Sequence, residues 1–170
     1  KPWTDPTPML LDPDLDVIFV ATPIGLHFEH GKQVIDANKH FWCEKPLTCR
    51  LQDTLELLEL SRRKGVSVCE GHMYLRHPQF RRLFEYVHDG SLGAIVSISC
   101  RFGIPRLEQS TFRNDPALGG GALFDVGCYP VSALLGLFPE ERMDVRYSVV
   151  ATRDSSAVDT DGHAIIALSN

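Results

Sequence analysis

The stretch Asp16-Val-Ile-Phe-Val-Ala-Thr22 decides the fold of this chain. It is short, apolar and rich in β-branched residues, and it ends at Pro23, which is typical of a strand buried on both faces of a parallel sheet. Residues 27–39 follow with a helical spacing of apolar side chains, and Phe41-Trp-Cys43 supplies the next apolar run. We therefore predict a strand, a helix and a second strand, joined by a right-handed crossover.

A second unit of the same kind follows directly. Leucines from Leu51 to Leu58 recur at the i, i+4, i+7 spacing and predict a helix that Thr48 can cap. Gly65 favours the end of that helix, and residues 66–69 are predicted to form the third strand. Two such units predict a doubly wound parallel sheet, whose ligands bind at the carboxyl ends of its strands.

The pattern changes after Gly71, where we place a domain boundary between residues 71 and 72. Beyond it we expect a helix over 77–89, an alternating strand over 94–102, a helix from Gly119 to about Leu137, and strands over 145–152 and 163–168. The fold class expected is thus α/β: part of a doubly wound domain over residues 1–71, then part of an α+β domain over residues 72–170 with an open, mainly antiparallel sheet.

Composition limits the classes of partner. The 170 residues are 44% hydrophobic and 23% charged, as in a globular protein, and the formal net charge is -5. The 17 basic residues are scattered, so we expect no nucleic-acid partner. The longest apolar runs, such as Val17 to Ala21, are strand-sized, so we expect no membrane partner and a cytoplasmic location. Because the chain starts at Lys1 and stops in an unfinished strand at Asn170, we expect both natural ends to lie beyond it.

No metal site is expected. The chain has five cysteines, an odd number, and no C-x-x-C pair, which argues for reduced thiols rather than a disulfide framework or a zinc site. His27 and His30 are spaced i, i+3 like a metal pair, but a third ligand is not nearby in the sequence.

Two motifs can carry chemistry. Cys43-Glu-Lys-Pro46 puts an acid and a base directly after a predicted parallel strand, and proline keeps the chain from continuing as a helix. Alone, the tripeptide Glu44-Lys-Pro46 is more often a surface feature. The segment from Phe112 to Pro130 is more informative, because Gly119-Gly-Gly121 permits close backbone approach to a ligand and Asp125 and Tyr129, four apart, share one helical face. The two polar groups are either satisfied in a core or directed into a pocket.

The motifs together resemble a known family. Their order along the chain is Val-Ala-Thr-Pro at 20–23 with His27, Glu-Lys-Pro at 44–46, Gly-Ser-Leu-Gly at 90–93, and Gly-Gly-Gly-Ala-Leu-Phe-Asp-Val-Gly-Cys-Tyr at 119–129. This succession resembles the glucose-fructose oxidoreductase and inositol dehydrogenase superfamily. Tyr129, where many members carry histidine, is most similar to the branch with dihydrodiol dehydrogenase and xylose dehydrogenase.

The resemblance implies a Rossmann domain, a second α+β domain, and hydride transfer between a nicotinamide and a CH–OH carbon of a sugar or related polyol or diol. Lys45 and Tyr129 would be the catalytic pair and Asp125 would orient the substrate or that pair. A tyrosine has a reference pKa of about 10, so a nearby ammonium would stabilise the phenolate that accepts the substrate proton.

The resemblance also implies a cofactor site. Thr22, Pro23 and His27 would line the cofactor, Glu44 and Lys45 would approach the nicotinamide ribose, and Arg113 is a candidate for the cofactor phosphate. The chain has no G-x-G-x-x-G turn after an N-terminal strand, so NADP and NAD both remain open, with NADP favoured by analogy. A homo-oligomer is expected for the complete protein, and the chain alone is expected to be inactive.

Some alternatives stay open. His72, Tyr74 and Arg76 match the family pattern only loosely and would then serve to pack the domain junction. Thr22 would otherwise only cap a helix. The alternative for the whole protein is a non-enzymatic nucleotide-binding sensor or scaffold, since a fold does not fix a function.

Overall fold

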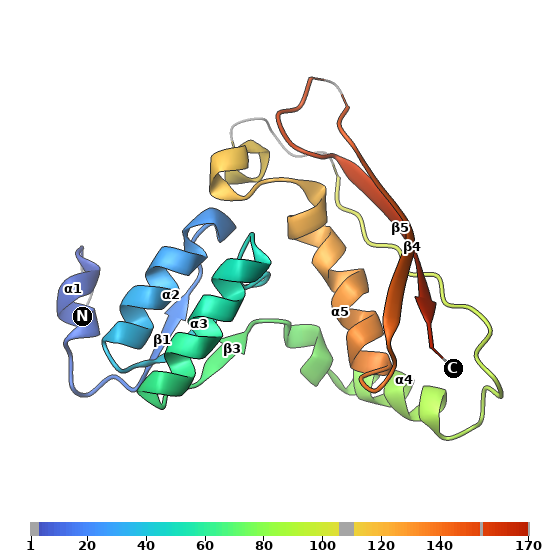
Figure 1. Ribbon diagram of the computed structural model, residues 1–170, viewed down its shortest axis with the longest axis horizontal. Coiled ribbons are helices and arrows are strands. Elements are labelled where there is room, and N and C mark those ends of the chain that lie inside the picture. The colour runs from blue at the N-terminus through green and yellow to red at the C-terminus, as the bar shows by residue number, and fades with distance from the viewer. Residues whose placement is uncertain (1–3, 106–110, 154, 170) are drawn as a thin grey trace. The chain divides into compact units, whose positions relative to one another are not determined.

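The computed structural model of this chain describes residues 4–105, 111–153 and 155–169 (Figure 1). The chain divides into two compact units. Unit 1 comprises Lys1–Gly71 and Asp115–Gly120, and unit 2 comprises His72–Asn114 and Gly121–Asn170. The assignment of residues 1–71 and 72–170 to two domains stays a prediction.

Unit 1 is built on a parallel sheet. Its strands are β1 (Val17–Val20), β2 (His40–Cys43) and β3 (Val68–Glu70), in the order β1-β2-β3. Its helices are α1 (Pro6–Leu10), α2 (His27–Asp36) and α3 (Leu51–Lys64), with the short 3₁₀ turns η1 (Ile24–Leu26) and η4 (Pro116–Leu118). Since α2 connects β1 to β2 and α3 connects β2 to β3, the predicted parallel sheet with crossover helices is confirmed.

The ends of the two crossover helices follow from local chemistry. Gly65 ends α3 in the left-handed conformation, with φ 68°, as predicted. Thr48 does not cap that helix, because the N-cap is Arg50; the Thr48 hydroxyl instead donates to the carbonyl of Arg50 at 2.7 Å. Helix α2 ends at Asp36 rather than at residue 39, since Asn38 adopts a positive φ of 58°.

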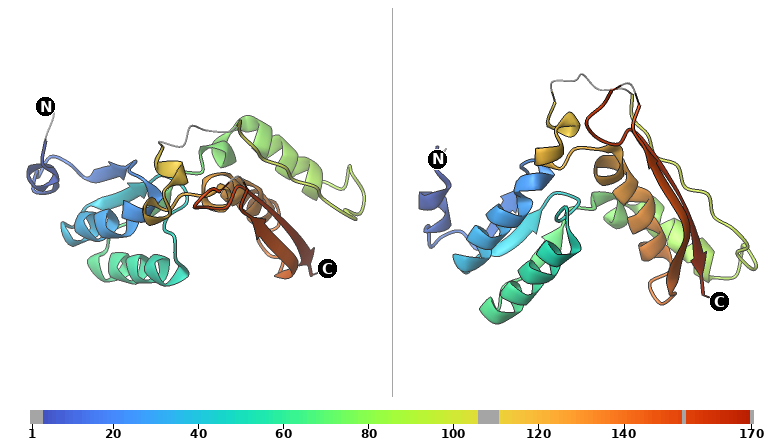
Figure 2. Two further views of the ribbon diagram at one scale, coloured as in Figure 1. Left: turned by 90° about the horizontal axis from the view of Figure 1, so that it is seen from above. Right: turned by 45° about the horizontal axis from the view of Figure 1, so that its top comes forward.

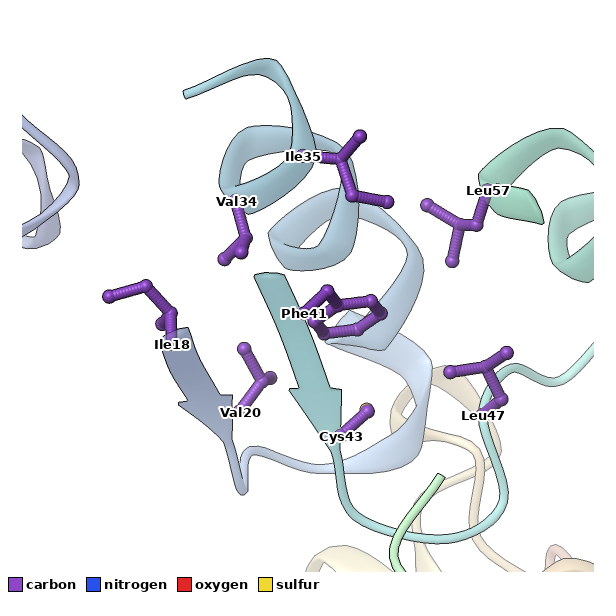
Figure 3. Packing of buried hydrophobic residues seen from close by; sticks show 8 residues of the cluster. All are labelled: Ile18, Val20, Val34, Ile35, Phe41, Cys43, Leu47 and Leu57. Atoms are coloured by element: carbon purple, nitrogen blue, oxygen red, sulfur yellow. The ribbon is translucent and has the colours of Figure 1, made fainter. Parts of the chain in front are cut away.

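The core of unit 1 lies between the sheet and the two crossover helices (Figure 3). Its buried members are Ile18, Val20, Val34, Ile35, Phe41, Cys43, Leu47 and Leu57. From α3 the buried side chains are Leu57 and Ser61 rather than the predicted Leu51 and Leu55, which are exposed. Leu57 and Ser61, four apart, form the stripe of α3 that faces the core.

The prediction that the first strand is buried on both faces is wrong for the described chain. Ile18 and Val20 are buried, whereas Val17 and Phe19 are about half exposed, at 49% and 48%. Trp42 of β2 is exposed on the same side and its ring lies 4.8 Å from that of Phe19. The physical reason is that α2 and α3 cover the same face of the sheet (Figure 2).

Unit 2 combines helices with an antiparallel ribbon. Its elements are η2 (Met73–Arg76), α4 (Pro78–His88), η3 (Phe112–Asn114), the π-helical turn η5 (Leu123–Gly127), α5 (Cys128–Leu137), β4 (Met143–Ala151) and β5 (Asp161–Leu168). Strands β4 and β5 pair antiparallel, with an irregularity between Val145 and Tyr147. The expected α/β fold class, a parallel sheet followed by an α+β part with an antiparallel sheet, is therefore confirmed.

Two predicted elements of unit 2 differ in the structure. Residues 94–102 do not form a strand, and Val96 is 95% exposed. An alternating pattern of side chains is not enough to form a strand where no described strand supplies hydrogen bonds to the segment. The helix predicted from Gly119 starts later, because Gly119 is left-handed with φ 75°, and it begins with the π-helical turn η5. Pro130 explains that widened turn, since its ring would clash with the carbonyl four residues earlier.

One long apolar segment was not predicted from the sequence. Among the described residues, Pro116–Leu137 is long and apolar enough, by length and composition, to cross a membrane, with 22 residues at a mean hydropathy of 1.3. The sequence pattern did not reveal this segment, because we considered only uninterrupted apolar runs and the charged residue Asp125 interrupts this one. The expectation of no membrane partner therefore stays a prediction.

Candidate functional site

The carboxyl edge of the unit 1 sheet carries the predicted residues Thr22, Glu44 and Lys45. The register aligns Val20 with Cys43 and Cys43 with Glu70, so the three strands end level with one another. Main-chain bonds extend this alignment past the strands, from Glu44 N to the Val20 carbonyl at 2.9 Å and from Gly71 N to the Cys43 carbonyl at 2.7 Å. The turns after β1 and β2 therefore start from the same edge, as expected of a ligand site in this kind of sheet.

The turn that carries Lys45 is held by neighbouring carboxylates. Glu70, at the end of β3, accepts a hydrogen bond from Leu47 N at 2.7 Å, and Glu44 accepts one from Lys45 N at 3.3 Å. The Lys45–Pro46 peptide bond is cis. Burial, followed by the nearby charges of Glu70 and Glu44, raises the pKa of the Cys43 thiol to about 12. Cys43 is thus a neutral core residue beneath the turn.

His27 lies inside unit 1 rather than on its surface. Its side chain is fully buried, with Nε2 2.8 Å from the Thr22 carbonyl and Nδ1 3.0 Å from the Pro46 carbonyl. Carbonyl oxygens only accept, so a neutral imidazole donates to one of them and an imidazolium to both. His27 therefore links the turn after β1 to the turn that carries Lys45, while its predicted contact with a cofactor stays a prediction.

The ring nitrogens of His27 and His30 have different hydrogen-bond partners and are not directed at a shared metal position. His30 Nδ1 lies 3.1 Å from Thr22 Oγ1, whereas His27 is turned to the two carbonyls. Across residues 4–105, 111–153 and 155–169, no group of three or more His, Cys, Asp or Glu side chains could hold a metal ion. The expectation of no metal stays a prediction.

In unit 2, Tyr129 stands at the start of α5 inside an aromatic cluster. Its ring stacks on Phe102, with centroids 4.7 Å apart and planes inclined by 8°. His72 contacts it edge-on at 5.8 Å, and Tyr74 lies at 5.7 Å. Offset and edge-on contacts of this kind are favourable for aromatic rings, so the cluster restricts how the Tyr129 ring can turn.

Tyr74 contributes more than a ring contact. Its phenol oxygen lies 2.6 Å from Ser132 Oγ, which also donates to the Tyr129 carbonyl at 3.0 Å. Burial raises the pKa of Tyr74, so this phenol remains neutral. His72 and Tyr74, whose roles the sequence left open, thus surround Tyr129 in unit 2.

Asp125 and Arg113 form an ion pair. Arg113 Nε donates to Asp125 Oδ2 at 2.8 Å, and the Asp125 side chain is only 16% exposed. The sequence placed these two residues in different roles, Asp125 toward the substrate and Arg113 toward the cofactor phosphate. The structure brings them together, so each fixes the position of the other.

Two of the three glycines before the helix, Gly119 and Gly121, have identifiable neighbours within their own units. A Cβ on Gly119 would lie 2.7 Å from Cys49 Sγ and 2.9 Å from Gly25 N, both in unit 1. A Cβ on Gly121 would meet the Asp159 carboxylate, in unit 2. The sequence predicted close approach to a ligand, and the close approaches that the structure contains are to protein atoms.

Asp159 is a residue that the sequence argument missed. It lies in the loop between β4 and β5, and its carboxylate accepts a hydrogen bond from Leu123 N at 2.6 Å. A separation of 36 residues between the partners leaves no local pattern that could have revealed the contact.

An open hollow of about 410 Å³ lies elsewhere on unit 1, lined by Val17, His40, Phe41, Trp42, Ser67 and Cys69. Val17 and His40 are the first residues of β1 and β2. The hollow is thus at the amino ends of the strands, whereas ligands of doubly wound sheets bind at the carboxyl ends, so we do not assign it to the site.

The parallel sheet with crossover helices and polar residues at its carboxyl edge places the chain in the class of Rossmann-type proteins, here followed by an α+β part. Residues 1–72 match the model of an oxidoreductase family with an NAD-binding Rossmann fold, and residues 80–170 match the model of the GFO/IDH/MocA C-terminal domain. The chain belongs to the GFO/IDH/MocA family of oxidoreductases.

Relatives of known activity are similar to most of the chain. The D-xylose 1-dehydrogenase (NADP(+)) 2 of Haloferax volcanii is 37% identical over 164 residues, covering 92% of this chain and 50% of that protein. The dTDP-3,4-didehydro-2,6-dideoxy-alpha-D-glucose 3-reductase of Actinomadura kijaniata is 34% identical over 160 residues, covering 94% and 48%. The chain thus spans about half the length of the curated relatives it matches.

Solved structures agree with this assignment. The crystal structure of a 3-ketoreductase from Actinomadura kijaniata with NADP and TDP-benzene superimposes with a TM-score of 0.86 at 34% identity, covering 94% of this chain and 49% of that one. Crystal structures with the same two ligands also exist for variants of that enzyme in which a lysine or a tyrosine is replaced.

Proposed function

We propose that the complete protein is an NAD(P)-dependent oxidoreductase that transfers a hydride between a nicotinamide and a CH–OH carbon of a sugar or a related polyol or diol. The observation that carries the proposal is the retention of Lys45 after β2 and of Tyr129 on α5. The lysine and the tyrosine replaced in the Actinomadura kijaniata 3-ketoreductase are separated by the same number of positions as Lys45 and Tyr129.

The chemistry of the residues supports a proton-transfer role for this pair. The phenol of Tyr129 accepts the proton of the substrate hydroxyl in oxidation and returns it in reduction, and the ammonium of Lys45 favours the phenolate. Asp125, held by Arg113 at 2.8 Å, orients the substrate. The nicotinamide, when bound, supplies the hydride acceptor or donor.

The side chains after β1 and β2 fit a nicotinamide nucleotide. The carboxylate of Glu44 can accept hydrogen bonds from ribose hydroxyls, Thr22 offers a hydroxyl, and Pro23 offers apolar surface. In this proposal Thr22, Pro23, Glu44 and Lys45 contact the cofactor, His27 supports them, and Arg113 approaches the cofactor phosphate. NADP is the preferred nucleotide by analogy with the two relatives named with it.

The same comparison supports a sugar as the class of substrate. The relatives act on small-molecule sugars, as their names state. We propose a carbohydrate or diol as the substrate, a cytoplasmic location and a homo-oligomeric complete protein, with neither nucleic acid nor membrane as a partner.

The test is to replace Lys45 by methionine in the complete protein and to measure formation of the reduced nicotinamide over a panel of aldoses and polyols. Methionine fills similar space without a charge, so turnover should fall by about 10²- to 10⁴-fold, while circular dichroism stays that of the wild type. Lys39→Met is the control, because Lys39 precedes β2 and its Nζ donates to the Asp12 carbonyl at 2.7 Å. Undiminished turnover of Lys45→Met would contradict the mechanism, and a wild type that binds the nucleotide but turns over no substrate would favour the non-enzymatic sensor.

A further inference from the structure

The helix that carries Asp125 and Tyr129 is held at its first turn by a residue from the far end of the chain. Asp159 accepts two main-chain hydrogen bonds there, one from Ala122 N to its carbonyl at 2.9 Å and one from Leu123 N to its carboxylate at 2.6 Å. The first N–H groups of a helix have no partner within the helix, and a carboxylate is the favourable acceptor because the helix N-terminus is electropositive.

Gly121 provides an independent sign that this contact is built into the fold. It has a φ of 120°, a conformation that side-chain-bearing residues rarely adopt, and an added Cβ would collide with the Asp159 carboxylate. The third glycine of the Gly119-Gly-Gly121 motif therefore makes room for Asp159. The absence of a side chain at Gly121 and the hydrogen bond to Leu123 N thus both place the Asp159 carboxylate against the start of the helix.

The turn that Asp159 holds leads directly to the proposed catalytic residues. Gly121 N donates to the Arg113 carbonyl and Asp125 N donates to the Gly121 carbonyl, each at 3.0 Å. Arg113 in turn pairs with the Asp125 carboxylate. Tyr129 follows one turn later, after the π-helical turn Leu123–Gly127. A shift of the first turn would thus move Asp125 and its ion pair, and Tyr129 with the same helix.

We infer that Asp159 is a positioning residue, which fixes the start of the η5–α5 helix and thereby sets where Asp125 and Tyr129 stand. This inference rests on the function proposed above, since it gives Asp159 a part in the same reaction. Asp159, in the loop between β4 and β5, thus contributes to the site although it is remote from Asp125 and Tyr129 in sequence.

The experiment compares Asp159→Ala, Asp159→Asn and Asp161→Asn in the complete protein. Asparagine keeps an acceptor oxygen for Leu123 N, alanine removes it, and Asp161 is a matched control on β5 whose carboxylate pairs with Arg153 at 2.8 Å. We expect Asp159→Ala to lower kcat by about 10- to 100-fold through misplacement of the reacting groups. Asp159→Asn should restore most of kcat, and KM for the cofactor should stay unchanged in all three variants.

Hydrogen exchange separates this inference from the proposed function. The peptide covering residues 121–127 should exchange about tenfold faster in Asp159→Ala than in the wild type or in Asp161→Asn, whether or not the protein has the proposed activity. Unchanged exchange in that peptide would overturn the inference, as would a folded Asp159→Ala enzyme with the kcat of the wild type. If Asp159→Ala does not fold, Asp159→Ser takes its place. Its shorter side chain should give an exchange rate in the peptide 121–127 between that of the wild type and the increase of about tenfold expected for alanine. An exchange rate equal to that of the wild type would overturn the inference.

Discussion

At the scale of single residues, the buried His27 and the exposed Glu70 hold the turns in which the proposed chemistry lies. His27 spans the carbonyls of Thr22 and Pro46, and Glu70 accepts from Leu47 N at 2.7 Å. A buried polar group without a partner costs more than its hydrogen bond contributes, so removing one member of such a set destabilises the fold. His27 thus supports both the predicted site and the interior of unit 1.

His27→Leu should be strongly destabilising. The substitution leaves two carbonyl oxygens without their ring partner, and the expected loss is about 2–4 kcal/mol of unfolding free energy. His30→Ala is the control, because His30 is partly exposed and its Nδ1 lies 3.1 Å from the Thr22 hydroxyl, so the cost of this substitution should stay below about 1 kcal/mol. Urea unfolding followed by circular dichroism measures both, and equal stabilities of the two variants would contradict this role of His27.

At the scale of elements, close packing decides how the helices of unit 1 sit on the sheet. A Cβ on Gly31 of α2 would lie 2.7 Å from the ring of Phe41 and 3.3 Å from Leu57 Cδ1. This glycine therefore lets α2 approach β2 and α3 closely, and a larger residue must push these elements apart.

Gly31→Ala should accordingly destabilise unit 1 although alanine favours helices. Overpacking of a dense core costs about 1–3 kcal/mol, which exceeds the gain of up to about 1 kcal/mol in helix propensity. Gly93→Ala serves as the comparison, because its φ of 66° strains alanine while nothing lies within 4 Å of the added atom. If thermal unfolding shows Gly31→Ala to be more stable than the wild type, the close packing of α2 on Phe41 is wrong.

The elements that the sequence predicted well are those with local causes. The parallel strands, both crossover helices and the end of α3 at Gly65 follow from apolar periodicity and one glycine. The segment 94–102 shows the limit, because alternation favours a strand only where another strand supplies hydrogen bonds. Asp159 shows another limit, since a cap that comes from 36 residues away leaves no local sequence pattern.

At the scale of the whole molecule, the proposed functional residues are divided between the two units. Thr22, Glu44 and Lys45 belong to unit 1, whereas Arg113, Asp125 and Tyr129 belong to unit 2. The motifs predicted the membership of the family, which the matches to both domain models confirm. The ion pair between Arg113 and Asp125 was not predicted from the sequence. The family resemblance implied separate roles, with Arg113 at the cofactor phosphate and Asp125 at the substrate.

The most direct measurement of the central claim is calorimetric titration of NADP and of NAD, separately, into the complete protein and into residues 1–170. A glycine-rich phosphate-binding turn is absent from the sequence of residues 1–170, so binding should occur in the complete protein and be lost or much weaker in the shorter chain. NADP should bind the complete protein more tightly than NAD. Binding of neither nucleotide to the complete protein would contradict the account of this chain as part of a nicotinamide-dependent oxidoreductase.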